Sequence, residues 1–394
     1  MRSRASSRCW RDWGSRGHER SGACPHSPAR RRGTHDATTA RACAREDNLK
    51  IGLVGFAGSG KTTVFNTLTG LNVPTGFGGD LHLGTVKVPD ERIDALSRIF
   101  KPKKTTYAEI TFSDIPGEHG AEKSGLSKKA IQQIRDQEVL CLVLRGFPNP
   151  AIEAAADPAA ELDAFHMECV LADLSIVERR LNRAQREKTE ALELAAFEMM
   201  KDALERERPI RSLPGNVLHR DFLKGYVLLT DRPLLVVLNR SEEEAAQPLP
   251  APLAARLTEV DAAGLVLSAS VEAEIARMDA ADQAAFLADL GLTESALARF
   301  IRTAYGLLDL ISFFTVGEDE VRAWPIRRGT KARPAAGKIH SDLERGFIRA
   351  EVIPYEHFIA DGSEHAAKEA GHLLVEGKDY TVVDGDIMHV RFNV

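Results

Sequence analysis

The sequence predicts an α/β fold: a mostly parallel sheet that carries a phosphate-binding loop, an inserted helical hairpin, and a smaller α+β unit at the C-terminal end. Three observations predict it. A glycine-rich loop lies between a short strand and a helix near residue 55, a long amphipathic helical stretch fills the middle, and short strand-like segments follow residue 306. The 394 residues, 43% hydrophobic and 28% charged, suit two or three globular domains.

Residues 1–48 differ in composition from the rest of the chain. They are rich in Arg, Ser, Gly, Cys and Ala, and they show no hydrophobic period. Such a segment buries too little apolar surface to offset chain entropy, so we expect it to be disordered. Three explanations remain open: an upstream stretch wrongly included in the translated frame, an organelle transit peptide, or a basic tail that contacts RNA.

The phosphate loop gives the strongest signal. Lys50–Val54 reads as a strand, "GFAGSGKT" follows, and the helix-like "TVFNTLTGL" comes next. This G-x-x-x-x-G-K-[ST] pattern is typical of a P-loop NTPase, in which backbone N–H groups and a helix N-terminus bind phosphates. A glycine-rich turn that binds nothing is the alternative. The predicted nucleotide-binding residues of the loop are Gly55, Ala57, Gly58, Ser59, Gly60, Lys61, Thr62 and Thr63.

A second strand ends at "SDIPG", which places a carboxylate beside the phosphate loop. We expect Thr62 and Asp114 to ligate Mg²⁺, Lys61 to reach the β- and γ-phosphates, and the Gly117 N–H to approach the γ-phosphate. The predicted catalytic residues are therefore Lys61, Thr62, Asp114 and Gly117. The stretch after Gly117 is interpreted as a switch. Glu118 and His119 could each orient water there, or be solvated loop residues.

The loop after the strand "RPLLVV" should read the base. Guanine is usually read by an aspartate in N-K-x-D, whereas this chain has Asn239 followed by Glu242 at the acidic position. The longer carboxylate would crowd guanine, and a lost charged hydrogen bond costs about 1.5–3 kcal/mol. This predicts weak guanine preference and leaves room for ATP. A loop without base contact is the alternative. Ser268 and Ala269, in "LSAS", form the predicted second base-side loop.

The middle of the chain predicts two amphipathic helices with a polar turn near Lys188. They either pair as an antiparallel hairpin or pack singly on the nucleotide domain. The repeating apolar positions are Met167, Val170, Leu174, Val177, Leu181 and Ala184, then Leu192, Ala196, Met199 and Ala203.

After residue 306 the pattern predicts the strands "FFTV", "EVRAWPI", "GFIRAEVI", "YTVV" and "IMHVRFNV", and one helix-like piece, "EHAAKEAGHLLVEG". The segment "RRGTKARPAAGK" is interpreted as a basic loop that either contacts RNA phosphates or is simply solvated. Its basic residues are Arg327, Arg328, Lys331, Arg333 and Lys338.

The order of these motifs, with "VPDERIDALSRIFKP" and "SFFTVGEDEVRAWPI", resembles the Obg-like ATPases of the YchF family from about Leu49 to Val394. The resemblance implies a Ras-like nucleotide domain with a coiled-coil arm and a C-terminal β-grasp TGS domain. It also implies an N-x-x-E base loop at Asn239 and Glu242, a preference for ATP over GTP, and the ribosome as partner.

This chain departs from the family pattern at three places. Its phosphate loop has Ala57–Thr62 where the family typically has P-N-V-G-K-S, and Glu118 stands where the family has an apolar residue. The first switch loop is shortened, and Thr75 is the candidate for its Mg²⁺-associated threonine. These departures affect hydrolysis and switching more than nucleotide binding.

We therefore predict a slow, Mg²⁺-dependent, ribosome-associated ATPase, cytoplasmic and monomeric, with ATP and Mg²⁺ as cofactors. No apolar run approaches the roughly 18 residues needed to span a membrane. A non-hydrolysing ATP-sensing adaptor and a GTPase with an atypical base loop are the rival hypotheses. The expected divisions are 1–48 (extension), 49–150 and 231–305 (nucleotide domain), 151–230 (helical arm) and 306–394 (TGS domain).

Overall fold

The computed structural model describes residues 48–76, 80–116, 128–184, 186, 189–218, 223 and 225–393. The expectations for residues 1–47, Gly117, Glu118, His119 and Lys188 fall outside these ranges.

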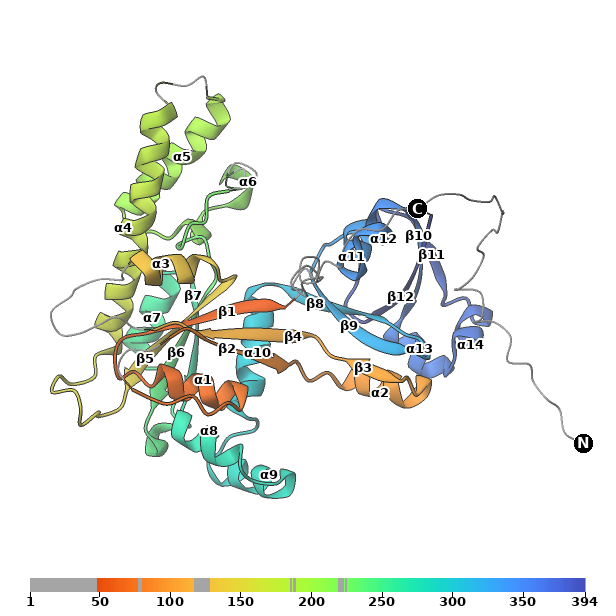
Figure 1. Cartoon of the computed structure of the whole chain (residues 1–394), viewed down its shortest axis with the longest axis horizontal. Helices are drawn as coiled ribbons and strands as arrows, with labels where there is room; N and C mark the ends of the chain where they lie inside the picture. Colours follow the sequence, from red (N-terminus) through yellow and green to blue (C-terminus); the bar gives the residue numbers. More distant parts are fainter. Residues whose placement is uncertain are drawn as a thin grey trace, which may run out of the picture. The chain divides into compact units, whose positions relative to one another are not determined.

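The predicted α/β fold is confirmed. Its first sheet has the order β2-β4-β1-β5-β6-β7, parallel except for β2 (Figure 1). The strands are β1 (Leu49–Val54), β2 (His82–Lys87), β4 (Glu109–Asp114), β5 (Val139–Gly146), β6 (Leu234–Arg240) and β7 (Ala262–Leu267).

Helices cover both faces of this sheet because its strands carry apolar side chains on both faces. In β5, Cys141 and Val143 pack into one core and Leu140 and Leu142 into the other, as period-2 alternation in a buried parallel strand requires. The first core includes α1 and α10, and the second includes the start of α4 and α7. The helices are α1 (Lys61–Thr69), α3 (Lys128–Arg135), α7 (Ala251–Glu259), α8 (Ala269–Ile275), α9 (Ala280–Asp289) and α10 (Ala296–Leu307).

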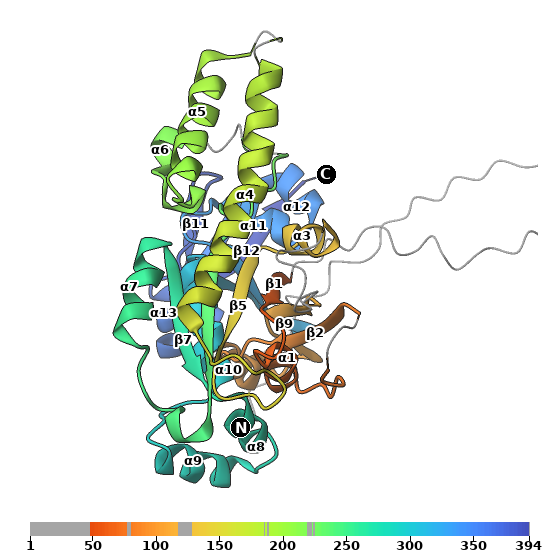
Figure 2. The same ribbon diagram turned by 90° about the vertical axis from the view of Figure 1, so that its left-hand side faces the viewer.

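The predicted helical hairpin consists of α4 (Pro158–Ala184) and α5 (Ala191–Glu205), which lie side by side in Figures 1 and 2. Both interpretations of this stretch hold for different parts of α4. Its first half packs Leu162 and Phe165 on the nucleotide sheet, and its second half packs Val177 against α5. The short η1 (Ile210–Ser212) and α6 (Gly215–Leu218) follow. No helix within the described ranges is long and apolar enough to cross a membrane.

The second sheet has the order β11-β10-β12-β8-β9-β3, and one of its strands comes from the first third of the chain. The strand β3 (Lys104–Thr106) pairs in parallel with β9, and α2 (Glu91–Phe100) packs beside it. The other elements are β8 (Leu310–Thr315), β9 (Glu320–Arg327), α11 (Ala332–Ile339), α12 (Ser341–Arg345), β10 (Phe347–Pro354), α13 (Tyr355–Asp361), α14 (Glu364–Glu369), β11 (Leu374–Glu376) and β12 (Asp386–Phe392).

The structure corrects three sequence expectations in this C-terminal unit. The basic segment is not all loop, because α11 begins at Ala332 and contains Arg333 and Lys338; Pro334 fits in its first turn, where backbone N–H groups lack intrahelical partners. The helix-like piece ends at Glu369, and Gly371, with φ +79°, reverses the chain toward β11. The expected strand 380–383 makes only one bridge, from Thr381 to Lys331.

Candidate nucleotide site

The phosphate loop joins β1 to α1 as the sequence predicts. Gly58 and Gly60 have φ values of +76° and +83°, in the left-handed region that side chains disfavour. A Cβ at Gly58 would collide with Ile152, and one at Gly60 would collide with the amide nitrogen of Asn239. Glycine at both positions avoids a strained backbone conformation and a steric clash.

Three of the predicted catalytic residues meet at the end of this loop. Asp114, the last residue of β4, lies beside β1, where its register partner is Leu53. One oxygen of its carboxylate accepts a hydrogen bond from the Lys61 ammonium, and the other accepts one from Thr62 Oγ1 at 2.9 Å. Lys61 and Asp114 are both buried. The fourth predicted residue, Gly117, lies outside the described ranges.

The site is a cavity of about 380 Å³, and Thr75 forms part of its wall. The wall residues that sequence reasoning missed include Asp80, His82, Phe147, Asn149 and Ala151. Asp80 and His82 lie at or near β2, whereas Phe147, Asn149 and Ala151 directly follow β5. Ligands commonly bind at the carboxyl ends of parallel strands, so the position after β5 was a signal for these three residues. The remaining lining residues are Gly55, Phe56, Ala57, Gly58, Gly60, Lys61, Thr62, Thr63, Pro74, Gly76, Asp114 and Pro116.

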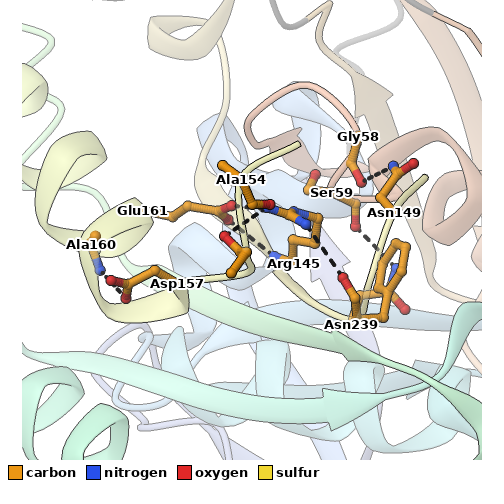
Figure 3. Close-up of polar contacts among 11 residues, drawn as sticks. Gly58, Ser59, Arg145, Asn149, Ala154, Asp157, Ala160, Glu161 and Asn239 are labelled. Atoms are coloured by element: carbon orange, nitrogen blue, oxygen red, sulfur yellow. Dashed lines mark hydrogen bonds and ion pairs between the residues drawn. The ribbon is translucent and has the colours of Figure 1, made fainter. Parts of the chain in front are cut away.

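The segment after β5 is fixed to the phosphate loop by hydrogen bonds (Figure 3). Asn149 donates from Nδ2 to the Gly58 carbonyl at 3.1 Å. The buried Arg145 guanidinium donates to the carbonyls of Ala154 and Ala155 at 2.9 and 3.0 Å, and the Arg145 backbone N–H donates to Glu161 of α4 at 3.0 Å. These contacts form a continuous connection from the phosphate loop to the base of the helical arm.

Asn239 holds the two predicted base-side loops against the phosphate loop. Its Nδ2 donates to the Ser59 carbonyl at 3.0 Å, and its Oδ1 accepts from the Ala269 N–H at 3.0 Å. Ser268, beside Ala269, is buried, and its hydroxyl lies 3.0 Å from that of Ser270. Both ends of the Asn239 amide are thus used within the protein. These bonds brace the base-side loops, and contact of Asn239 with the base stays a prediction.

Glu242 lies at the start of a short 3₁₀ turn, η3 (Glu242–Glu244), and its side chain is exposed. That position leaves its carboxylate available to a base, and the contact itself stays a prediction. Ser59 Oγ is buried and has no hydrogen-bond partner among the described residues. A buried hydroxyl of this kind in a phosphate loop can hydrogen-bond a bound phosphate.

The donor set also suits a magnesium ion bound together with phosphate. Thr62 and Asp114 offer hydroxyl and carboxylate oxygens, which Mg²⁺ prefers, and few protein ligands are typical of Mg²⁺ at nucleotide sites. Within the described ranges, no group of three or more His, Cys, Asp or Glu residues could hold a metal by itself. The protein oxygens therefore fit an ion that phosphate oxygens and water complete.

Comparison with known proteins gives two family matches. The model described as "50S ribosome-binding GTPase" matches residues 50–177, and the YchF-GTPase C-terminal model, described as a protein of unknown function, matches residues 310–393. The "Ribosome-binding ATPase YchF" of Bacillus subtilis is 39% identical over 365 residues, which cover 88% of this chain and 100% of that protein. This chain belongs to the YchF family. The YchF relative of Escherichia coli O157:H7, with the same name, is 38% identical over 88% of this chain and 99% of its own length.

A solved YchF structure agrees with this assignment. The Schizosaccharomyces pombe protein titled "YchF GTPase" superposes with a TM-score of 0.75, covers 87% of this chain and 98% of its own length, and is 29% identical. The family expected from the sequence is therefore confirmed. The bacterial relatives are named ATPases and the yeast protein a GTPase, so base preference has to be argued from this chain's own residues.

Proposed function

We propose that this YchF chain is a slow Mg²⁺-dependent ATPase whose nucleotide state controls its association with the ribosome. One observation carries the proposal: Lys61, Thr62 and Asp114 converge in the cavity at the end of β1. The names of the bacterial relatives support the same activity and partner. The proposed location is the cytoplasm, and the proposed form is a monomer.

Catalysis in this proposal depends on positioning and charge. The Lys61 ammonium and the backbone N–H groups of the phosphate loop would stabilise negative charge on the β- and γ-phosphates. Magnesium, when bound, supplies further charge neutralisation, and Thr62 and Asp114 would hold it. Because Asp114 is hydrogen-bonded to both Lys61 and Thr62, phosphates must share the Lys61 ammonium with this carboxylate.

The proposed base preference rests on Glu242. An aspartate at this position would accept two hydrogen bonds from guanine, and the extra methylene of glutamate displaces that carboxylate. Losing one charged hydrogen bond lowers affinity about ten- to a hundredfold. Adenine lacks this pair of donors and loses nothing. We therefore assign ATP as the nucleotide.

Single-turnover phosphate release with ATP and GTP, measured side by side, tests the proposal. The expected result is slow release that is faster with ATP. Faster release with GTP would establish the GTPase alternative. Measurable ATP binding without release of phosphate from either nucleotide would establish the non-hydrolysing adaptor.

For the ribosome, we propose that the helical hairpin and the basic residues around α11 make the contact. Arg328 is ion-paired with Asp309, Arg333 donates to a backbone carbonyl, and Lys331 donates to Thr381 Oγ1. Arg327 and Lys338 are exposed and well placed to reach phosphates. Each phosphate contact steepens the salt dependence of binding. The double variant Arg327→Ala/Lys338→Ala should co-sediment with ribosomes more weakly and with a shallower salt slope. Arg98→Ala, an exposed charge in α2, is the matched control.

A further inference from the structure

His82 is a titratable side chain in the cavity wall to which the proposed function gives no role. It is the first residue of β2, the edge strand of the nucleotide sheet, and its register partner in β4 is Asp114. His82 lines the same cavity as Lys61 and Thr62. Its Nδ1 atom is buried and has no hydrogen-bond partner among the described residues.

The sheet order tells which end of a nucleotide His82 would meet. Strands β6 and β7 lead into the base-side loops and lie at one edge of the sheet, while β2 and β4 lie at the opposite edge (Figure 1). Asn239, at the end of β6, bonds the phosphate loop at Ser59. Asp114, at the end of β4, bonds Lys61 and Thr62 at the start of α1. His82 is therefore on the side of the terminal phosphate, away from the base.

Nδ1 has less than 1 Å² of accessible surface, so it does not face the cavity. A neutral imidazole has one nitrogen that donates and one that accepts, and Nε2 is the nitrogen that remains to donate to a ligand in the cavity. A phosphate oxygen beside the Asp114 site can accept from Nε2–H. The other cavity groups on this side are Thr75 and Asp80, and the Asp80 carboxylate cannot donate to a phosphate when ionised.

We infer that His82 hydrogen-bonds the terminal phosphate of the bound nucleoside triphosphate and so makes the site favour triphosphate over diphosphate. This inference rests on the proposed function, because it needs a triphosphate in the cavity. It assigns His82 a specificity role that no sequence motif indicates.

The test compares the affinity of the full chain for Mg²⁺ with a non-hydrolysable β,γ-methylene ATP analogue and for Mg²⁺ with ADP, by titration calorimetry. His82→Ala should weaken analogue binding about tenfold, the loss of one hydrogen bond to a charged group, and leave ADP affinity within about twofold. His82→Gln places an amide near the position of Nε2 and should restore most of the difference. Leu83→Ala, its exposed neighbour on β2, is the control for strand integrity and should match wild type.

Equal losses for analogue and ADP in His82→Ala, or no loss for either, would overturn the inference. Full loss in His82→Gln with an unchanged melting temperature would also overturn it. The same titrations with GTP analogue and GDP separate the two proposals. If wild type prefers guanine nucleotides, the assignment of ATP fails. The effect of the His82 variants is then judged from their affinities for the GTP analogue and for GDP. If wild type binds no nucleotide, both fail.

Discussion

Replacing Asn239 with alanine should destabilise the nucleotide domain more than any other single change at the base side of the site. The amide is 3% exposed and joins β6 to the Ser59 carbonyl and to the Ala269 N–H. Its removal leaves two backbone groups without partners, in a place that water reaches poorly. Each such group costs about 1–3 kcal/mol, so the free energy of unfolding should fall by about 2–6 kcal/mol.

Urea unfolding monitored by circular dichroism measures this loss. The urea concentration at the midpoint should decrease, and the dependence of the unfolding free energy on urea concentration should stay the same. Asn149→Ala is the matched comparison in the same cavity. It removes the hydrogen bond to the Gly58 carbonyl and an exposed one from the Ala151 N–H. Because the side chain is only half-buried and water can replace these partners, a loss of about 1 kcal/mol is expected. An Asn239→Ala variant that loses less stability than Asn149→Ala would refute the bracing role.

Three further outcomes are expected. Lys61→Ala should abolish ATP binding in filter assays, since it removes the ammonium that Asp114 holds in the cavity; unchanged affinity would place the phosphate site elsewhere. Asp173→Ala should lower the melting temperature sharply. This buried carboxylate accepts hydrogen bonds from the backbone N–H groups of Leu229 and Thr230 and from the Thr230 hydroxyl, and all three would be lost. A small shift would contradict a stabilising role for these three bonds. Burial lowers the pKa of the His166 imidazole below its ordinary 6.5. The unfolded chain therefore binds the proton first as pH falls through 6.5, which destabilises the folded state. Between pH 7.5 and pH 5.5 the melting temperature of the wild type should fall further than that of His166→Gln. Equal decreases would show that His166 does not titrate in this way.

The nucleotide site shows what a local pattern can predict. The phosphate loop was found from sequence because its function requires specific residues at fixed spacing, and Gly58 and Gly60 have the conformations that only glycine adopts easily. The structure also brings Asp114 to Lys61 and Thr62, as the ends of neighbouring parallel strands predict. Asn149 was missed because "FPNPA" contains no motif, and its position after a parallel strand does not by itself single out one residue. Its role depends on Arg145 fixing the following segment, which only the folded chain shows.

The C-terminal unit shows where propensity alone fails. Leu374–Glu376 continues the amphipathic pattern of α14, yet pairing with β10 makes it a strand, because the partner strand decides the outcome for so short a segment. The expected strand 380–383 lacks such a partner apart from one bridge. Nothing in the sequence around Lys104–Thr106 indicates a pairing with β9 more than 200 residues away.

The pairing of β3 with β9 has a practical consequence for dissecting this molecule. A fragment cut at residue 306 would leave β9 as a bare sheet edge and would strip α2 from Val321 and Phe314, which share one apolar core with Ile93 and Leu96. Unprotected edges of this kind recruit other strands, so such a fragment should self-associate. Exchange of C-terminal modules between relatives would succeed only if residues 88–108 were transplanted with them.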